Sequence, residues 1–284
     1  MSTNGPSLDE LRRRLDAVDD RIHDLIVERA GVVESIGALK QSTGQPPFRP
    51  GRVAAILRRV AARHRGPFPR QSLVRLWCEL LSGSVAMQGP FTVAVAVPDA
   101  RPGLWDIARD YFGGYVPMLA LRSPAEVLSA VGDGRAAVGV LPMPSDKENA
   151  PWWPALAGAR GQGPRVIARL PFAAGGNARE TGGDALVIGA AEADATGADR
   201  TMLVAETRGE LSRARLLAAF ESAGTRVAYL AAHPVAPKET WHLIELDGLV
   251  TPQDARLAGA LQPLGAPDIW AFGSYARPLP GEQS

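Results

Sequence analysis

A long stripe of apolar residues near the amino terminus most constrains what this chain can fold into. The stripe steps alternately by three and four residues, which is the a/d spacing of a helix that packs along one narrow face. Its members are Leu8, Leu11, Leu15, Val18, Ile22, Leu25, Val32, Ile36 and Leu39. No proline occurs from Ser7 to Gln45, and Ser7 with Glu10 resembles a capping box. The pattern predicts one helix over residues 8–41, about 50 Å long, which favours packing against a second copy of the chain.

Two cations lie on this stripe or close to it. Arg29 takes the place of an aliphatic residue between Leu25 and Val32, and Lys40 follows on nearly the same face of the helix. A guanidinium buried on a helix seam is costly unless it is paired. Either an anionic ligand meets the two cations, or both pair with acids of the same bundle, or the Arg29 side chain extends to solvent.

Length and composition indicate a globular protein. The chain has 284 residues, of which 46% are hydrophobic, and this suits two or three domains with substantial cores. The first residues, MSTNGPSLDELRRR, contain no apolar signal region, and no run of about 18 apolar residues occurs. Cys78 is the only cysteine. These features predict a cytoplasmic protein that has no disulfides and no association with a membrane.

Charge and residue spacing argue against several classes of partner. Residues 1–89 hold 14 Lys and Arg against 9 Asp and Glu, but the two signs alternate, which is typical of a solvated helix face rather than of a nucleic-acid surface. The histidines are scattered without ligand spacing, and the glycine-containing stretches at 132–139 and 158–164 match no nucleotide-binding loop. We therefore expect no nucleic-acid partner, no metal and no cofactor.

Proline- and glycine-containing breaks divide the amino-terminal segment into three helices. GQPPFRPG separates the long helix from a second one over residues 52–63, and RGPFP precedes a third over residues 71–88. Ser84 and Gln88 are four residues apart, so they share a face of this third helix.

The hydrophobic period changes beyond Phe91. Residues 91–142 alternate between strand and helix patterns in the order βαβαβ, which predicts a small α/β unit. Residues 152–183 are rich in Gly, Pro and Ala and predict a loop with one strand at 165–170. From Thr201 the order βαββαβ predicts a four-stranded antiparallel sheet with both helices on one face.

The amino-terminal segment resembles the all-helical class of chorismate mutases over residues 7–88. The resemblance rests on LRRRLDAVDDRIHDLIVER, IGALK, the RPGR turn and SGSVAMQ, in this order and at this spacing. It implies an all-α three-helix domain in an intertwined homodimer. It also implies an isomerase that converts chorismate to prephenate, by a pericyclic rearrangement, in aromatic amino acid biosynthesis.

The same resemblance implies a set of substrate-binding residues. The set is Arg12, Arg29, Lys40, Arg52, Ser84 and Gln88. Lys40 and Gln88 would donate to the ether oxygen of chorismate and would, together with Arg29, be catalytic. The other members would contact the two substrate carboxylates, with Arg12 reaching across the dimer into the opposite site.

This reaction needs no acid, base, nucleophile or metal, because it is an intramolecular rearrangement that also proceeds unaided. The enzyme can hold the compact conformer of the substrate and present fixed donors where negative charge grows. Val53 departs from the family, which usually has at this place a glutamate that contacts the substrate's ring hydroxyl. The departure predicts a weaker hold on that hydroxyl.

The rest of the chain resembles a shortened prephenate dehydratase region followed by an ACT-like regulatory domain. The three dehydratase motif positions read VPDA at 97–100, PMPS at 142–145 and GDA at 183–185. The resemblance places a catalytic Thr-Arg-Phe at the last of these, and none of the three motifs survives. The short span between the last two leaves no room for the second lobe of a dehydratase and its cleft. The phenylalanine-binding positions of the ACT-like part read GEL at 209–211 and AAHP at 231–234.

We expect a chorismate mutase domain at residues 1–89, a reduced dehydratase-like α/β domain at 90–192 and an ACT-like domain at 193–284. Two hypotheses about function remain. The chain is an active chorismate mutase with a carboxyl-terminal region that lacks dehydratase catalysis, and in that case residues 1–90 should keep most of the mutase rate. Alternatively, it is a non-catalytic regulator that binds a partner enzyme or an aromatic metabolite.

Overall fold

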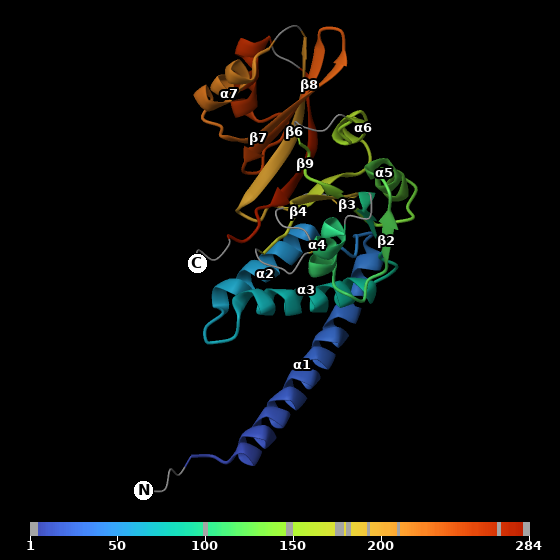
Figure 1. Cartoon of the computed structure of the whole chain (residues 1–284), viewed down its shortest axis with the longest axis vertical. Coiled ribbons are helices and arrows are strands. Elements are labelled where there is room, and N and C mark those ends of the chain that lie inside the picture. The colour runs from blue at the N-terminus through green and yellow to red at the C-terminus, as the bar shows by residue number, and fades with distance from the viewer. Residues whose placement is uncertain are drawn as a thin grey trace. The chain divides into compact units, whose positions relative to one another are not determined.

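The computed structural model describes residues 5–98, 102–145, 150–173, 179, 183–191, 194–208, 211–265 and 268–280. The chain forms two compact units, one of Met1–Pro47 with Ser84–Pro90 and the other of Phe48–Gly83 with Phe91–Ser284. The helices (Figure 1) are α1 Leu8–Ser42, α2 Pro50–Arg63, α3 Arg70–Ala86, α4 Gly103–Phe112, α5 Pro124–Gly132, α6 Trp153–Ala157, α7 Arg213–Ser222, α8 Ala255–Leu261 and the 3₁₀ turn η2 Gln262–Leu264. The strands are β1 Val93–Ala96, β2 Met118–Leu121, β3 Val138–Pro142, β4 Arg165–Leu170, β5 Ala185–Gly189, β6 Asp199–Arg208, β7 Val227–Ala236, β8 Glu239–Asp247 and β9 Asp268–Ala276.

The long amino-terminal helix is confirmed as the single helix α1 (Figure 1). Its capping box is also confirmed, because the Glu10 N–H donates to the Ser7 hydroxyl at 3.2 Å and the Ser7 N–H donates to the Glu10 carboxylate at 2.7 Å. The residues of the apolar stripe are 45% to 65% exposed in the single chain. A stripe of this length that stays in water is an unsatisfied packing face.

The second and third helices match their expected positions within two residues. Helix α3 ends at Ala86 rather than at Gln88. Gln88 lies in the following turn, where its N–H donates to the Val85 carbonyl at 3.0 Å. The helix stops because Gly89 has φ of +155° and Pro90 follows, a pair that cannot continue α-helical geometry.

The strands of the second unit form one nine-stranded sheet in the order β2-β1-β3-β5-β4-β9-β6-β8-β7. Its first part confirms the predicted βαβαβ unit, since β1 pairs in parallel with both β2 and β3. The two crossovers run in opposite directions across the sheet, so right-handed connections place α4 and α5 on opposite faces.

The two parts of the sheet join through the parallel pairing of β4 with β9 at Val166 and Gly273. Gly273 has φ of +147°, and a Cβ at this position would clash with the Val166 backbone. Only glycine permits this conformation and this close approach.

The carboxyl-terminal part confirms the predicted βαββαβ sheet with both helices on one face. Strands β9, β6, β8 and β7 are antiparallel neighbours. Helices α7 and α8 cover one face of these strands through a fully buried cluster that includes Leu203, Phe220, Ile244 and Leu257.

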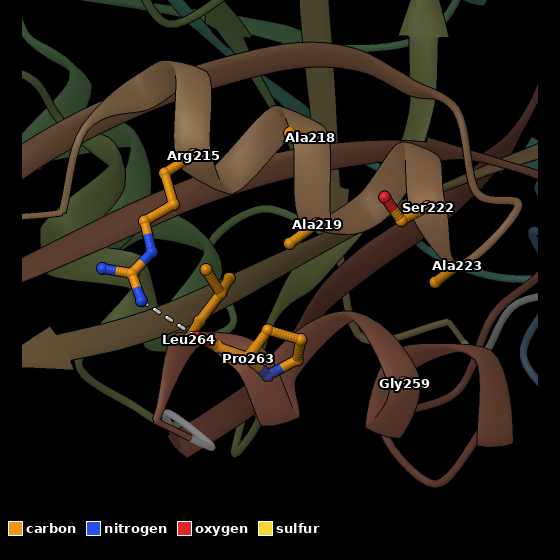
Figure 2. Close-up of a pocket in the computed structure, with 8 residues that line it drawn as sticks. All are labelled: Arg215, Ala218, Ala219, Ser222, Ala223, Gly259, Pro263 and Leu264. Atoms are coloured by element: carbon orange, nitrogen blue, oxygen red, sulfur yellow. Dashed lines mark hydrogen bonds between the residues drawn. The ribbon is translucent and has the colours of Figure 1, made fainter.

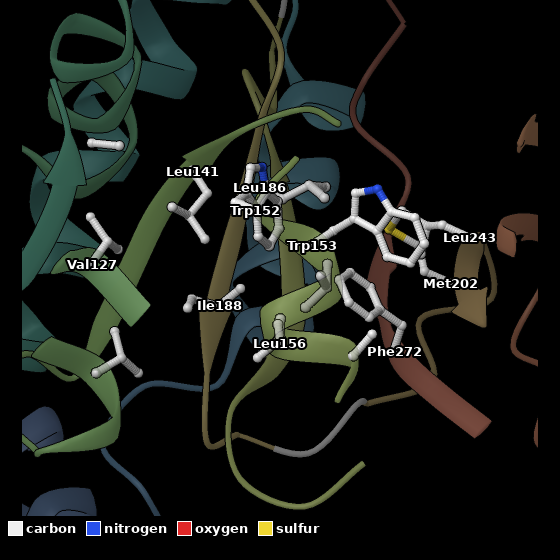
Figure 3. Packing of buried hydrophobic residues seen from close by; sticks show 14 of the residues in the cluster. Val127, Leu141, Trp152, Trp153, Leu156, Leu186, Ile188, Met202, Leu243 and Phe272 are labelled. Carbon is white, nitrogen blue, oxygen red and sulfur yellow. The ribbon is translucent and has the colours of Figure 1, made fainter. Parts of the chain in front are cut away.

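The opposite face of these strands packs against a second core, which continues under the first part of the sheet (Figure 3). Met202, Leu243 and Phe272 meet Trp153 there, and Trp153 is 1% exposed. Helix α6, which begins at Trp153, contradicts the prediction that only loop surrounds β4. Its five residues are too few to show a helical period.

Strand β5 was not predicted either. Its residues, ALVIG, are all buried and therefore show no alternation of apolar and polar positions. The strand pairs antiparallel with both β3 and β4, so it completes the first part of the sheet.

The expected domain boundaries fall in connections between elements. The boundary at residues 89 and 90 lies between α3 and β1, and the one at 192 and 193 lies between β5 and β6. The division into three domains stays a prediction, because the sheet continues past the second boundary. None of the helices in the described part of the chain is long and apolar enough to cross a membrane.

Candidate active site

Arg29 and Ser84 meet in the first compact unit. The Arg29 guanidinium, from the middle of α1, donates to the Ser84 hydroxyl at 2.5 Å, across 55 residues of sequence. Ser84 is 8% exposed, and burial lowers the pKa of Arg29. An arginine remains cationic despite such a shift, so the structure holds a half-buried positive charge beside a buried hydroxyl.

Gln88 lies next to this pair. Its side-chain Nε2 donates to the Ser84 carbonyl at 2.8 Å, and an amide nitrogen carries a second N–H that can serve a ligand. Its Oε1 is buried and has no hydrogen-bond partner among the described residues. The amide is therefore held at one atom, while the rest of its hydrogen-bonding capacity is available.

Gly37 is a residue of this site that sequence reasoning missed. It is buried on α1, and a Cβ at this position would lie 3.0 Å from the Gln88 Cγ. Glycine inside a helix costs about 1 kcal/mol relative to alanine, but Gly31 on the same helix has open space around it, so sequence alone does not single out Gly37. The missing side chain makes room for Gln88 beside α1.

Lys40 lies one turn after Gly37 on α1, on a neighbouring part of the same helix surface. Its Nζ donates to the Pro47 carbonyl at 2.7 Å, and the side chain is half-buried. The contact holds the ammonium near the carboxyl-terminal end of α1.

Arg12 lies far from this group along α1, and Arg52 belongs to the other compact unit. Arg12 forms an exposed i,i+3 ion pair with Asp9 at 3.4 Å, and it lies about 25 Å from Arg29 along α1 at 1.5 Å per residue. Arg52 belongs to the second unit, where it is exposed on the first turn of α2. The neighbouring Val53 is 9% exposed.

Two of the three dehydratase motif positions, 142–145 and 183–185, lie side by side in the second unit. Pro142 pairs with Ala185 across β3 and β5, and the Met143 N–H donates to the Asp184 carbonyl at 2.9 Å. The Asp184 carboxylate is bound by Arg169 at 2.5 Å. An acid in an ion pair therefore stands where the resemblance places a catalytic arginine.

Some of the other motif positions cannot be described. The residues Asp99, Ala100, Gly209 and Glu210 lie outside the described residues, whereas 231–234 lie on strand β7.

The ACT-like part has a groove between α7 and α8 (Figure 2), with a volume of about 340 Å³. Arg215 closes one end of the groove by donating to the Pro263 carbonyl at 3.1 Å.

The residues gathered in the first unit can donate hydrogen bonds to a small anion. It combines a guanidinium, a hydroxyl, an amide and an ammonium, all on or next to α1 and α3. Among the described residues, no group of three or more His, Cys, Asp or Glu side chains could hold a metal ion. Preorganised donors of this kind can stabilise negative charge on a bound ligand.

Comparison with known proteins relates the helical segment to a family. Residues 11–89 match the family model described as chorismate mutase type II, so this segment is similar to that family. A bifunctional chorismate mutase/prephenate dehydratase of Pseudomonas aeruginosa is 30% identical over 148 residues, which cover 50% of this chain and 40% of the relative. The match therefore spans less than half of that relative's length.

Two solved structures show distant likeness to the chain. One is GqqA, described as a novel type of quorum quenching acylase, with 18% identity and a TM-score of 0.49 over 68% of this chain and 97% of that one. The other is the prephenate dehydratase from Arthrobacter aurescens in complex with L-Phe, with 16% identity and a TM-score of 0.47 over 66% of this chain and 92% of that one. Neither likeness assigns an activity to the carboxyl-terminal region.

Proposed function

We propose that this protein is a chorismate mutase, an isomerase that converts chorismate to prephenate in aromatic amino acid biosynthesis. The observation that carries the proposal is the hydrogen bond from Arg29 to Ser84, with the Gln88 amide anchored on the same serine. Three residues that the resemblance places around one substrate thus come together from the middle of α1 and the end of α3.

Arg29 and Ser84 hold a carboxylate of chorismate. A guanidinium has five N–H donors, so Arg29 can bind a carboxylate bidentately while it keeps its bond to Ser84. Burial strengthens this interaction, because the site excludes much of the competing water. The clamp selects the compact conformer in which the bond-forming carbon atoms approach each other.

Lys40 and Gln88 donate to the ether oxygen, on which negative charge grows as the C–O bond breaks. A fixed donor of this type is worth about 3 to 4 kcal/mol in the transition state. The mechanism requires no proton transfer, so it uses no acid or base.

The active form is a homodimer with shared sites. The apolar stripe of α1 is 45% to 65% exposed in the single chain, and a second copy of the same stripe can bury it with knobs-into-holes packing. Because Arg12 lies about 25 Å from Arg29 along α1, it reaches a site only in the partner subunit. There it completes the carboxylate contacts together with Arg52.

The carboxyl-terminal region has no dehydratase activity in this proposal. Support comes from Asp184, which stands in place of the catalytic arginine and forms an ion pair with Arg169.

The single cysteine, Cys78, is buried in α3, and burial raises its pKa to about 12. A thiol of this kind is inert, which fits a biosynthetic enzyme of the cytoplasm.

Subunit complementation tests the reaction and the shared site together. Arg12→Ala and Arg29→Ala homodimers should each be inactive in a spectrophotometric assay of chorismate loss. Co-expressed at equal ratio they should recover about one quarter of wild-type activity, because half of the dimers are mixed and one of the two sites in each is intact. No recovery, despite heterodimers shown by mass spectrometry, would refute the shared site. An inactive wild-type protein would refute the mutase assignment.

A further inference from the structure

Helix α2 is attached to the carboxyl-terminal region by one arginine that makes three hydrogen bonds. Arg58 donates to the Thr196 hydroxyl and to the carbonyls of Ala198 and Arg277, each at 2.7 Å. The Ala198 carbonyl also accepts from the Arg277 N–H at 2.9 Å. The guanidinium therefore binds at the point where the start of β6 meets the end of β9.

The first turn of α2 makes a second attachment to the same segment. Arg49, the residue before the helix, forms a two-point ion pair with Asp194, with its Nε at 3.3 Å from the carboxylate. Gly51 packs so closely on Asp194 that a Cβ at this position would clash with the carboxylate side chain. Arg52 is the next residue, so the contacts of Arg49 and Gly51 with Asp194 hold the helix turn that carries it.

The segment that makes both attachments, residues 194–199, is held in one conformation. The Asp199 carboxylate is buried and accepts from the Thr196 hydroxyl at 2.5 Å, from the Thr196 N–H at 2.8 Å and from the Gly197 N–H at 3.2 Å. Gly197 has φ of +82°, which other residues rarely adopt. Because β6 starts at Asp199, the segment is anchored directly to the sheet.

We propose that residues 194–199 position the first turn of α2, and with it Arg52, so that the carboxyl-terminal region serves as a scaffold for the mutase site. The inference rests on the proposed function, which makes Arg52 a substrate-binding residue. Arg58, Asp194 and Thr196 are then positioning residues. The proposal revises the expectation that residues 1–90 alone keep most of the mutase rate, since such a fragment lacks this segment.

Loss of these contacts should weaken substrate binding more than it slows the chemical step. A carboxylate clamp contacts ground state and transition state alike, so its displacement raises KM and leaves kcat nearly unchanged. A displacement of about 1 Å can cost on the order of 100-fold in kcat/KM. An exposed ion pair alone contributes little, so Arg58 should matter more than Arg49.

The test uses the full chain with Arg58→Ala, Thr196→Val and Asp194→Ala. Arg59→Ala is the matched control, because Arg59 is the next residue on α2 and is exposed. The first readout is steady-state kinetics with chorismate. The second is hydrogen exchange at Val53, whose N–H donates to the Arg49 carbonyl at 3.1 Å and closes the first turn.

We expect Arg58→Ala to raise KM about 10- to 100-fold and to accelerate hydrogen exchange at Val53. Thr196→Val and Asp194→Ala should change KM and exchange in the same direction but by less. Arg59→Ala should leave both quantities at their wild-type values. The Arg49→Ala, Asp194→Ala double variant should be no worse than the poorer single variant. Unchanged KM and exchange in folded Arg58→Ala and Thr196→Val proteins would overturn the scaffold. If the wild-type protein does not consume chorismate, the proposed function fails, whereas the exchange measurement still decides whether the segment holds the turn.

Discussion

The two ends of the chain differ in which apolar surfaces they bury and which they leave exposed. Helix α1 carries two of the proposed substrate-binding residues, Arg29 and Lys40, and leaves its apolar stripe exposed, with Leu15 and Leu25 both at 60%. The carboxyl-terminal sheet buries its apolar side chains on both faces, as at Leu203 and Met202, which are both 0% exposed. In our proposal one region carries the chemistry and has an uncovered apolar face, whereas the other has a complete core and no dehydratase chemistry.

In the proposed function, a packed core and a catalytic site are therefore properties of different regions of the chain. Fully burying a leucine contributes about 1.5 to 3 kcal/mol, so the sheet is stable without any ligand or partner. A single α1 helix gains no such stabilisation from its stripe. We infer that the helical part depends on association, and that the carboxyl-terminal part was retained as a folded body rather than as an enzyme.

The largest effect is expected at Arg29. Arg29→Leu removes the guanidinium that holds a substrate carboxylate in the proposed site. Because the compact conformer is then no longer selected, we expect kcat/KM to fall at least about 100-fold. Stability should change little, because the substitution removes a half-buried cation and loses its hydrogen bond to the Ser84 hydroxyl, which is worth about 1 kcal/mol. Chorismate turnover and the thermal midpoint would be measured on the same preparation. A large fall in the midpoint would mean that Arg29 is chiefly structural.

The second-largest effect is expected for a charged substitution in the apolar stripe of α1. Leu25→Asp places a carboxylate in the seam of the proposed dimer, so we expect dissociation to monomers and loss of shared-site activity. Val27→Asp is the matched control, because Val27 is 58% exposed on the same helix but lies off the stripe. Analytical ultracentrifugation distinguishes the two variants. If the two variants have the same oligomeric state, the apolar stripe is not the dimer interface.

A smaller effect is expected at Gly37. Gly37→Ala raises helix propensity by about 1 kcal/mol, but its Cβ would lie 3.0 Å from the Gln88 Cγ and push the amide away. We expect kcat to fall about tenfold, within the range for a displaced donor, while the thermal midpoint is kept or raised. Gly31→Ala provides the control, since nothing lies within 4 Å of its added Cβ. Its kcat should equal that of the wild type.

The smallest effect is expected at Val53. Glutamate there would return the family's acceptor for the substrate hydroxyl, and from the sequence alone the variant should be faster. Val53 is only 9% exposed, however, and burial of a polar group without a partner costs about 1 to 3 kcal/mol. We therefore expect Val53→Glu to lower the free energy of unfolding by about that amount, with no gain in kcat/KM. A faster and equally stable variant would show that the side chain reaches substrate.

The sequence predicted the elements whose periods are long or whose caps are explicit. Helix α1 followed from its heptad spacing and the Ser7 cap, and the antiparallel sheet followed from element order. Helix α6 and strand β5 were missed because a five-residue helix and a fully buried strand carry no period. Their positions depend on tertiary burial, as Trp153 shows.

The site was predictable only in part for a similar reason. Arg29 was conspicuous because it interrupts an apolar stripe, and it donates a hydrogen bond to Ser84. The roles that the resemblance implied for these two residues stay a prediction. Gly37 was not recognised, because the need for a glycine becomes visible only once Gln88 is placed beside α1. The attachment of Arg58 to Thr196 joins residues 138 positions apart, and no local pattern reports such a contact.

The measurement that tests the central claim most directly is identification of the products formed from chorismate by the purified full-length protein. A time course by proton NMR distinguishes chorismate, prephenate and phenylpyruvate in one sample. The account predicts that prephenate accumulates far faster than in the uncatalysed control and that phenylpyruvate stays at background. Unconsumed chorismate would contradict the mutase assignment, and phenylpyruvate above background would contradict the loss of chemistry from the carboxyl-terminal region.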